Sequence, residues 1–144
     1  MFLLYLISPL AINVSLESAS YSVVEGETVK LCAIVQNGEL EKSIELEISI
    51  VGQSDSDQEK DYKLTKSTFS LRPAQNQSCT MVEILNDNLV EGNETFRVIL
   101  SSMDSAVTIS SPSSAIITIE DIDGMMLSIS LYVDVIIMVC LLTS

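Results

Sequence analysis

Apolar and polar residues alternate with a period of two through most of the chain between residues 12 and 124. The alternation is clearest over residues 44–50, where aliphatic side chains are separated by Glu45, Glu47 and Ser49. A period of two is typical of a strand that buries one face. The same pattern returns in five other runs, over residues 29–35, 69–71, 80–84, 96–100 and 115–119. It predicts a protein built from β-strands.

Turn-forming residues separate these runs. Asn37-Gly38, the polar stretch 52–60, Pro73 and the triplet 86–88 each fall between two of them. Short strands with turn signals roughly every ten residues are typical of a sandwich with Greek-key connections. The predicted fold class is therefore all-β: one antiparallel Greek-key β-sandwich of about seven strands, immunoglobulin-like, over residues 12–124.

The first eleven residues form an apolar segment of about the length of a signal-peptide core. No positively charged residue precedes it, and no small-x-small cleavage site is evident near Ala11. A secretory signal, a truncated gene model and a first strand of the sandwich are the three interpretations.

Residues 125–144 form an apolar tail close to the roughly 20 residues that a membrane helix needs. Asp134 lies in its middle, where a carboxylate costs roughly 2.5–3.5 kcal/mol on insertion scales. The tail is a candidate transmembrane anchor. A lipid-anchor signal and the start of a second module are the alternatives.

Composition limits the classes of partner and of reaction that the chain can support. The chain carries 20 Asp and Glu residues against 7 Lys and Arg, a net charge of −13, and has no histidine. Such a surface repels nucleic acid and anionic membranes, and Ser-His-Asp catalysis is excluded. Two carboxylates alone can hydrolyse glycosides, but the chain has no Trp to stack on a sugar. The composition indicates a protein that is not an enzyme.

The acidic residues that stand out lie at the ends of predicted strands. They are Glu25, Asp61, Asp87, Glu91, Glu94, Asp121 and Asp123. Every second connection of a sandwich meets at the same end, so these carboxylates can gather at one pole. Calcium takes 6–8 oxygen ligands and tolerates irregular loops. From spacing alone, a solvated acidic rim and a calcium site are equally compatible with the sequence.

Three segments resemble the Calx-beta domain, at residues 21–50, 60–100 and 111–123. The most specific is NDNLVEGNETFRV, with its acidic pair, its EGNE and its aromatic residue; SPSSAIITIEDID closes the unit. The resemblance covers about residues 12–124. This family is the module of sodium–calcium exchangers, integrin β4 and large extracellular adhesion receptors, so it implies a β-sandwich that binds Ca²⁺ in cell adhesion or cell communication.

The resemblance also implies a ligand set. The calcium ligands of the family fall on Glu25, Asp61, Asp87, Glu91, Asp121 and Asp123, with support from Asn86, the Leu89 carbonyl and Glu94. Two positions depart from the exchanger pattern: Asn86 replaces an Asp, and Ile122 interrupts the terminal Asp triplet. Because Ile cannot coordinate a cation, we expect fewer ions than the four of an exchanger site.

Cys32 and Cys79 fall on strands that we expect to be neighbours in one sheet, on the face opposite the core. A cross-strand disulfide and two free thiols are both compatible with the sequence, and an extracellular location favours the disulfide. Cys140 belongs to the apolar tail.

Three N-x-Ser/Thr sequons, at Asn13, Asn76 and Asn93, are candidate glycosylation sites and favour an extracellular or cell-surface location. The expected function is a calcium-binding extracellular module whose partners are calcium ions and other extracellular domains or proteins. The alternative is a metal-free spacer domain in a larger ectodomain.

Overall fold

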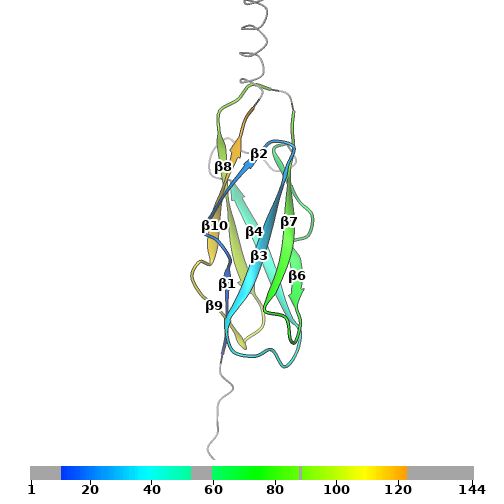
Figure 1. Ribbon diagram of the computed structural model, residues 1–144, viewed down its shortest axis with the longest axis vertical. Coiled ribbons are helices and arrows are strands. Elements are labelled where there is room, and N and C mark those ends of the chain that lie inside the picture. Colours follow the sequence, from blue (N-terminus) through cyan, green and yellow to red (C-terminus); the bar gives the residue numbers. More distant parts are fainter. Residues whose placement is uncertain (1–10, 53–59, 88, 123–144) are drawn as a thin grey trace, which may run out of the picture.

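The chain forms two β-sheets packed face to face, in a computed structural model that describes residues 11–52, 60–87 and 89–122 (Figure 1). Ten strands are found in the described residues. They are β1 (Ile12–Leu16), β2 (Ser20–Val24), β3 (Thr28–Asn37), β4 (Ile44–Gly52), β5 (Tyr62–Leu64), β6 (Thr68–Leu71), β7 (Gln77–Ile84), β8 (Glu94–Ser102), β9 (Val107–Ile109) and β10 (Ser114–Glu120).

One sheet has the strand order β5-β7-β3-β1-β9, and the other has the order β2-β10-β8-β4-β6. The predicted β-sandwich is thereby confirmed. Two pairs, β1 with β9 and β2 with β10, are parallel, while the other ladders are antiparallel. The parallel pairs arise because the N-terminal segment changes sheet after Leu16, so that β1 and β2 each run beside a late strand.

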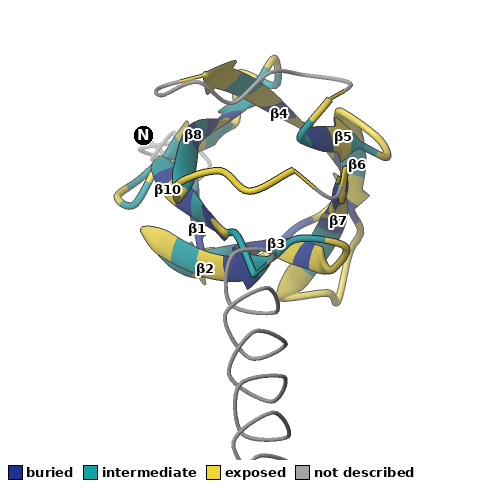
Figure 2. Ribbon diagram, turned by 90° about the horizontal axis from the view of Figure 1, so that it is seen from above, coloured by how far each residue is buried: buried dark blue, intermediate teal, exposed yellow. Residues whose placement is uncertain are grey.

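Alternate residues of the long strands point into the space between the sheets. On β4, Ile44, Leu46 and Ile48 are buried while the intervening residues are exposed. The view along the sandwich shows the buried residues on strands that surround one interior (Figure 2). Aliphatic side chains dominate this core, and Phe96 of β8 is its largest fully buried side chain.

The ring of Phe96 stacks on that of Tyr62, with the ring centroids 4.2 Å apart. Tyr62 is the first residue of β5, in the sheet opposite β8. The stack therefore joins the two sheets near the starts of both strands.

The disulfide between Cys32 and Cys79 links β3 to β7. The two residues are direct partners in the antiparallel ladder, with their Cα atoms 4.1 Å apart. Cys32 is 1% exposed but does not belong to the core cluster. Because Leu31 and Ala33 on either side point inward, the bridge lies on the outer face of the sheet. Cys140 lies outside the described residues.

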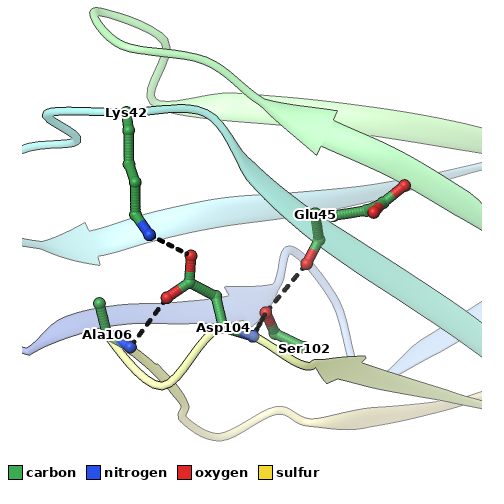
Figure 3. Close-up of polar contacts among 5 residues, drawn as sticks. All are labelled: Lys42, Glu45, Ser102, Asp104 and Ala106. Atoms are coloured by element: carbon green, nitrogen blue, oxygen red, sulfur yellow. Dashed lines mark hydrogen bonds and ion pairs between the residues drawn. The ribbon is translucent and has the colours of Figure 1, made fainter.

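At one end of the sandwich, Asp104 organises the connection from β8 to β9 (Figure 3). Its carboxylate accepts a hydrogen bond from the Ala106 N–H at 3.0 Å and pairs with Lys42 Nζ at 3.0 Å. The Ser102 hydroxyl donates to the Glu45 carbonyl at 2.9 Å. These contacts tie the connection to the start of β4.

Candidate metal centre

Three carboxylates from separate parts of the chain meet at the opposite end of the sandwich. One oxygen atom each of Asp61, Glu91 and Glu94 lies within 4.8 Å of the other two. Asp61 and Glu94 are half-buried, and Glu91 is exposed. We call these three residues the acidic cluster.

Asp61 is positioned by the ladder between β5 and β7. It immediately precedes β5, and its carbonyl accepts a hydrogen bond from Leu85 N–H at 2.9 Å. The ladder thus continues one pair beyond the two strands. Tyr62, the next residue, turns into the core.

Glu91 and Glu94 belong to the connection between β7 and β8. The N–H of Glu91 donates to Oδ2 of Asp121 at 2.6 Å, which fastens this connection to the end of β10. The N–H of Leu89 donates to Oδ1 of Asp87 at 2.9 Å, a local turn. Glu94 is the first residue of β8. Its position is therefore set by the sheet, and that of Glu91 by Asp121.

The turn between β2 and β3 lies at the same end. Gly26 has a φ of +78°, a conformation that favours glycine. Glu25 N–H donates to the Glu120 carbonyl at 3.3 Å, and the Glu27 carbonyl accepts from Ile84 N–H at 2.9 Å. The turn thereby joins the ends of β7 and β10.

Hydrogen bonds place the strand ends that carry Glu25, Asp61, Glu91 and Asp121 at one pole of the sandwich. Within it, Asp61 and Glu91 lie together. Glu94, which we expected only as support, is a full member of the acidic cluster. Asp121 touches the cluster through the Glu91 N–H, whereas Glu25 and Asp87 are not among its three members. Asp123 lies outside the described residues.

The donor set of the acidic cluster consists of carboxylate oxygens alone. Calcium and magnesium prefer such ligands, while zinc and copper favour nitrogen and sulfur. Calcium also accepts flexible, irregular coordination better than magnesium does. The cluster is therefore chemically suited to a calcium ion.

The candidate modification sites differ in accessibility. Asn13 is half-buried on β1, between two neighbouring strands, whereas Asn76 and Asn93 are exposed in connections. Asn93 lies between the two glutamates of the acidic cluster in the sequence.

The described residues contain no helix of sufficient length and apolar character to cross a membrane. The candidate anchor at residues 125–144 and the first ten residues lie outside the described part.

Comparison with known proteins agrees with this architecture. The family model described as the Calx-beta domain matches residues 10–123. No curated protein sequence matches the chain.

Several solved structures have the same fold. The crystal structure of CBD12 from CALX1.2 is 21% identical, with a TM-score of 0.69 over 78% of this chain and 46% of that chain. The apo-form Calx CBD1 domain is 21% identical, with a TM-score of 0.68 over 76% of this chain and 96% of that one. The structure titled calcium binding domain CBD12 of CALX1.1 is 20% identical, with a TM-score of 0.68 over 76% and 44%.

Proposed function

The chain belongs to the Calx-beta domain family, and from that premise we propose that it is a calcium-binding module of the cell surface or extracellular space. The observation that carries the proposal is the acidic cluster, because Asp61, Glu91 and Glu94 are far apart in the sequence and converge within 4.8 Å. Three carboxylates held this close repel one another. A divalent cation bound between the three carboxylates would attract each of them and offset their mutual repulsion.

Asp61, Glu91 and Glu94 would hold the ion. Asp121, already hydrogen-bonded to Glu91, would serve as a further ligand or orient the loop. Glu25, Asp87 and Asp123 are the remaining candidate ligands, with Asn86 and the Leu89 carbonyl as neutral oxygen donors. A related structure is titled a calcium binding domain, which supports the same choice of ion.

The module acts by binding, in this proposal, and not by catalysis. Calcium would fix the connections at the acidic pole relative to the sheets. The pole would then present one defined surface to other extracellular domains or proteins, in adhesion or communication. Exposed Asn76 and Asn93 are the preferred glycan acceptors, and residues 125–144 the proposed membrane anchor.

Calorimetric titration of the full chain with CaCl₂ tests the proposal. We expect saturable binding that Glu91→Gln and Glu94→Gln weaken by at least roughly tenfold each, the lower bound seen when supporting groups of metal sites are lost. Each substitution keeps the size of the side chain and removes its charge.

Glu47→Gln is the matched control, because Glu47 is exposed on the outer face of β4 and lies outside the cluster. It should leave the calcium affinity unchanged. Absence of binding to the unmodified chain at millimolar calcium would contradict the proposal and favour a metal-free spacer domain.

A further inference from the structure

The disulfide between Cys32 and Cys79 is accessible from one of its two ends. Cys32 is 1% exposed, whereas Cys79 is half-buried. Cys79 also lines a groove of about 570 Å³ on the flank where β6 and β7 pack against each other, and Cys32 does not. A molecule from solution therefore meets the disulfide at Cys79.

The order of the strands gives the same direction of approach. β7 lies between β3 and β6 in the view along the sandwich (Figure 2). The bond from Cys32 to Cys79 runs from β3 to β7. Thiol–disulfide exchange proceeds by attack of a thiolate on one sulfur, in line with the bond that breaks. At Cys79, that line continues past β7 toward the groove.

The approach to Cys79 is lined by cations. Lys66 is anchored beside it, because the Lys66 carbonyl accepts a hydrogen bond from the hydroxyl of Thr80, the next residue of β7, at 2.8 Å. Arg72 lines the same groove, and no carboxylate does. Neither cation forms an ion pair with another residue in the described ranges. Together they favour an anionic molecule at Cys79 over a neutral one.

The approach to Cys32 is closed by an acidic residue. Glu17 N–H donates to the Cys32 carbonyl at 2.9 Å, which keeps the chain after β1 beside Cys32. The Glu17 carboxylate accepts a hydrogen bond from Gln77 Nε2 at 3.4 Å, so these two side chains meet across the outer face of β3. An in-line attack on Cys32 would come from the Glu17 side, where the carboxylate covers the sulfur and repels anions.

We propose that Cys79 is a site of S-thiolation by low-molecular-weight thiols that carry carboxylates. The thiolate of such a molecule attacks Cys79 Sγ, a new S–S bond forms there, and the bond to Cys32 breaks. Cys32 Sγ leaves with the electron pair and takes up a proton from water, so the products are a mixed disulfide at Cys79 and a thiol at Cys32. Lys30, two residues before Cys32 and on the same face of β3, stabilises the leaving thiolate.

The test follows the exchange in the full chain with Cys140→Ser, which leaves Cys32 and Cys79 as its cysteines. We call this the parent chain. Mercaptosuccinate serves as the anionic thiol and mercaptoethanol as the neutral one, both in EDTA. Acid stops the reaction at early times, and peptide mapping by mass spectrometry locates the adduct. We expect the first mercaptosuccinate adduct on Cys79, with Cys32 as the free thiol.

The double variant Lys66→Gln/Arg72→Gln, made in the parent chain, tests the role of the groove. It should slow the reaction with mercaptosuccinate by roughly tenfold, the lower end of what charged clefts contribute to association rates. Its reaction with mercaptoethanol should be unchanged. Lys42→Gln/Lys63→Gln removes the same charge outside the groove and should react like the parent chain with both thiols.

The salt dependence of the parent chain repeats the test without a charge substitution. Each rate is divided by that of the same thiol with a small neutral disulfide. If the groove cations act on the thiol, salt at about 1 M should slow mercaptosuccinate, because the Debye length falls to about 3 Å. If the net charge of −13 acted alone, the same salt would speed the reaction up.

Four results would overturn the proposal. They are adducts on Cys32 as frequent as those on Cys79, an equal effect of the double variant on both thiols, acceleration of mercaptosuccinate by salt, and no reaction of the folded chain where the urea-unfolded chain reacts. A variant that had only loosened its fold would react faster with mercaptoethanol, and the salt dependence then decides. Because all arms contain EDTA, none of these outcomes depends on the calcium site.

Discussion

Asp104 illustrates how a single carboxylate is held by its surroundings at the end of the molecule away from the acidic pole. The Ala106 N–H and the Lys42 ammonium lower the pKa of Asp104, and the backbone hydrogen bond is the larger cause. Lys42 is 70% exposed, so solvent screens the ion pair. The contact positions the β8–β9 connection more than it stabilises the fold.

The lowered pKa predicts a pH-dependent contribution to stability. A carboxylate with a depressed folded pKa stabilises the folded state above its unfolded pKa of about 3.9 and loses that effect as the pH falls through the folded value. Asp104→Asn keeps an acceptor oxygen but loses the charge. We expect its free energy of unfolding in urea to lie below that of the unmodified chain at pH 7, and the gap to close below about pH 4.

Lys42→Met is the companion variant, because it removes the ion pair and leaves the Ala106 hydrogen bond. At pH 7, Lys42→Met should lower the free energy of unfolding by only part of the amount that Asp104→Asn does. A gap that stays constant between pH 7 and pH 3 would contradict the assignment of the effect to the Asp104 charge.

The sequence predicted the three residues of the acidic cluster, but not which of them would act as ligands and which only as support. Asp61 and Glu91 were expected as ligands and lie together. Glu94 was expected only as support, because the ligand set implied by the family resemblance did not include it. It is the first residue of β8, and alternation does not indicate which carboxylate it approaches. Asp87 folds back on Leu89 N–H, a local turn that spacing alone does not distinguish from a ligand position.

At the scale of elements, the Tyr62–Phe96 stack connects the core to the acidic cluster. Tyr62 follows Asp61, and Phe96 comes two residues after Glu94. The stacked rings hold the starts of β5 and β8 against each other across the sandwich. The distance between Asp61 and Glu94 therefore depends on the core.

Removing the Phe96 ring should lower both the stability of the fold and its affinity for calcium. Phe96 is fully buried, so Phe96→Ala is expected to lower the free energy of unfolding by about 3–5 kcal/mol. Calcium affinity, measured by titration below the unfolding temperature, should fall as well because Asp61 and Glu94 lose their common support. Met103→Ala is the control, since Met103 is 96% exposed. Unchanged calcium affinity in a destabilised but folded Phe96→Ala would show that the stack does not position the cluster.

The six strands with clear alternation in the sequence are all present in the structure. The ones that the sequence did not define are β1, β2, β5 and β9, with three to five residues each. Alternation over three residues, as in β5 and β9, is weak evidence for a strand unless a turn residue bounds it, as Pro73 does for the run 69–71. Two of the four, β1 and β2, also form parallel pairs with late strands, and such long-range partners are invisible in a local pattern.

At the scale of the whole molecule, charge is distributed unevenly. Carboxylates converge at one pole, whereas the flank between β6 and β7 carries Lys66 and Arg72 and no carboxylate in its groove. The sequence gives the net charge of −13 but not this separation, because it depends on which strand ends and edges the topology brings together.

We propose that the gathered carboxylates bind calcium only in the folded state. Such binding stabilises the fold by RT ln(1 + [L]/Kd), or about 2.7 kcal/mol when free calcium is 100 times Kd. The deciding measurement is the thermal unfolding of the full chain and of the double variant Glu91→Gln/Glu94→Gln, each in EDTA, in magnesium and in increasing calcium. We predict that calcium raises the melting temperature of the unmodified chain progressively, that magnesium does so less, and that the double variant does not respond. A melting temperature of the unmodified chain that is the same in EDTA and in millimolar calcium would contradict the claim.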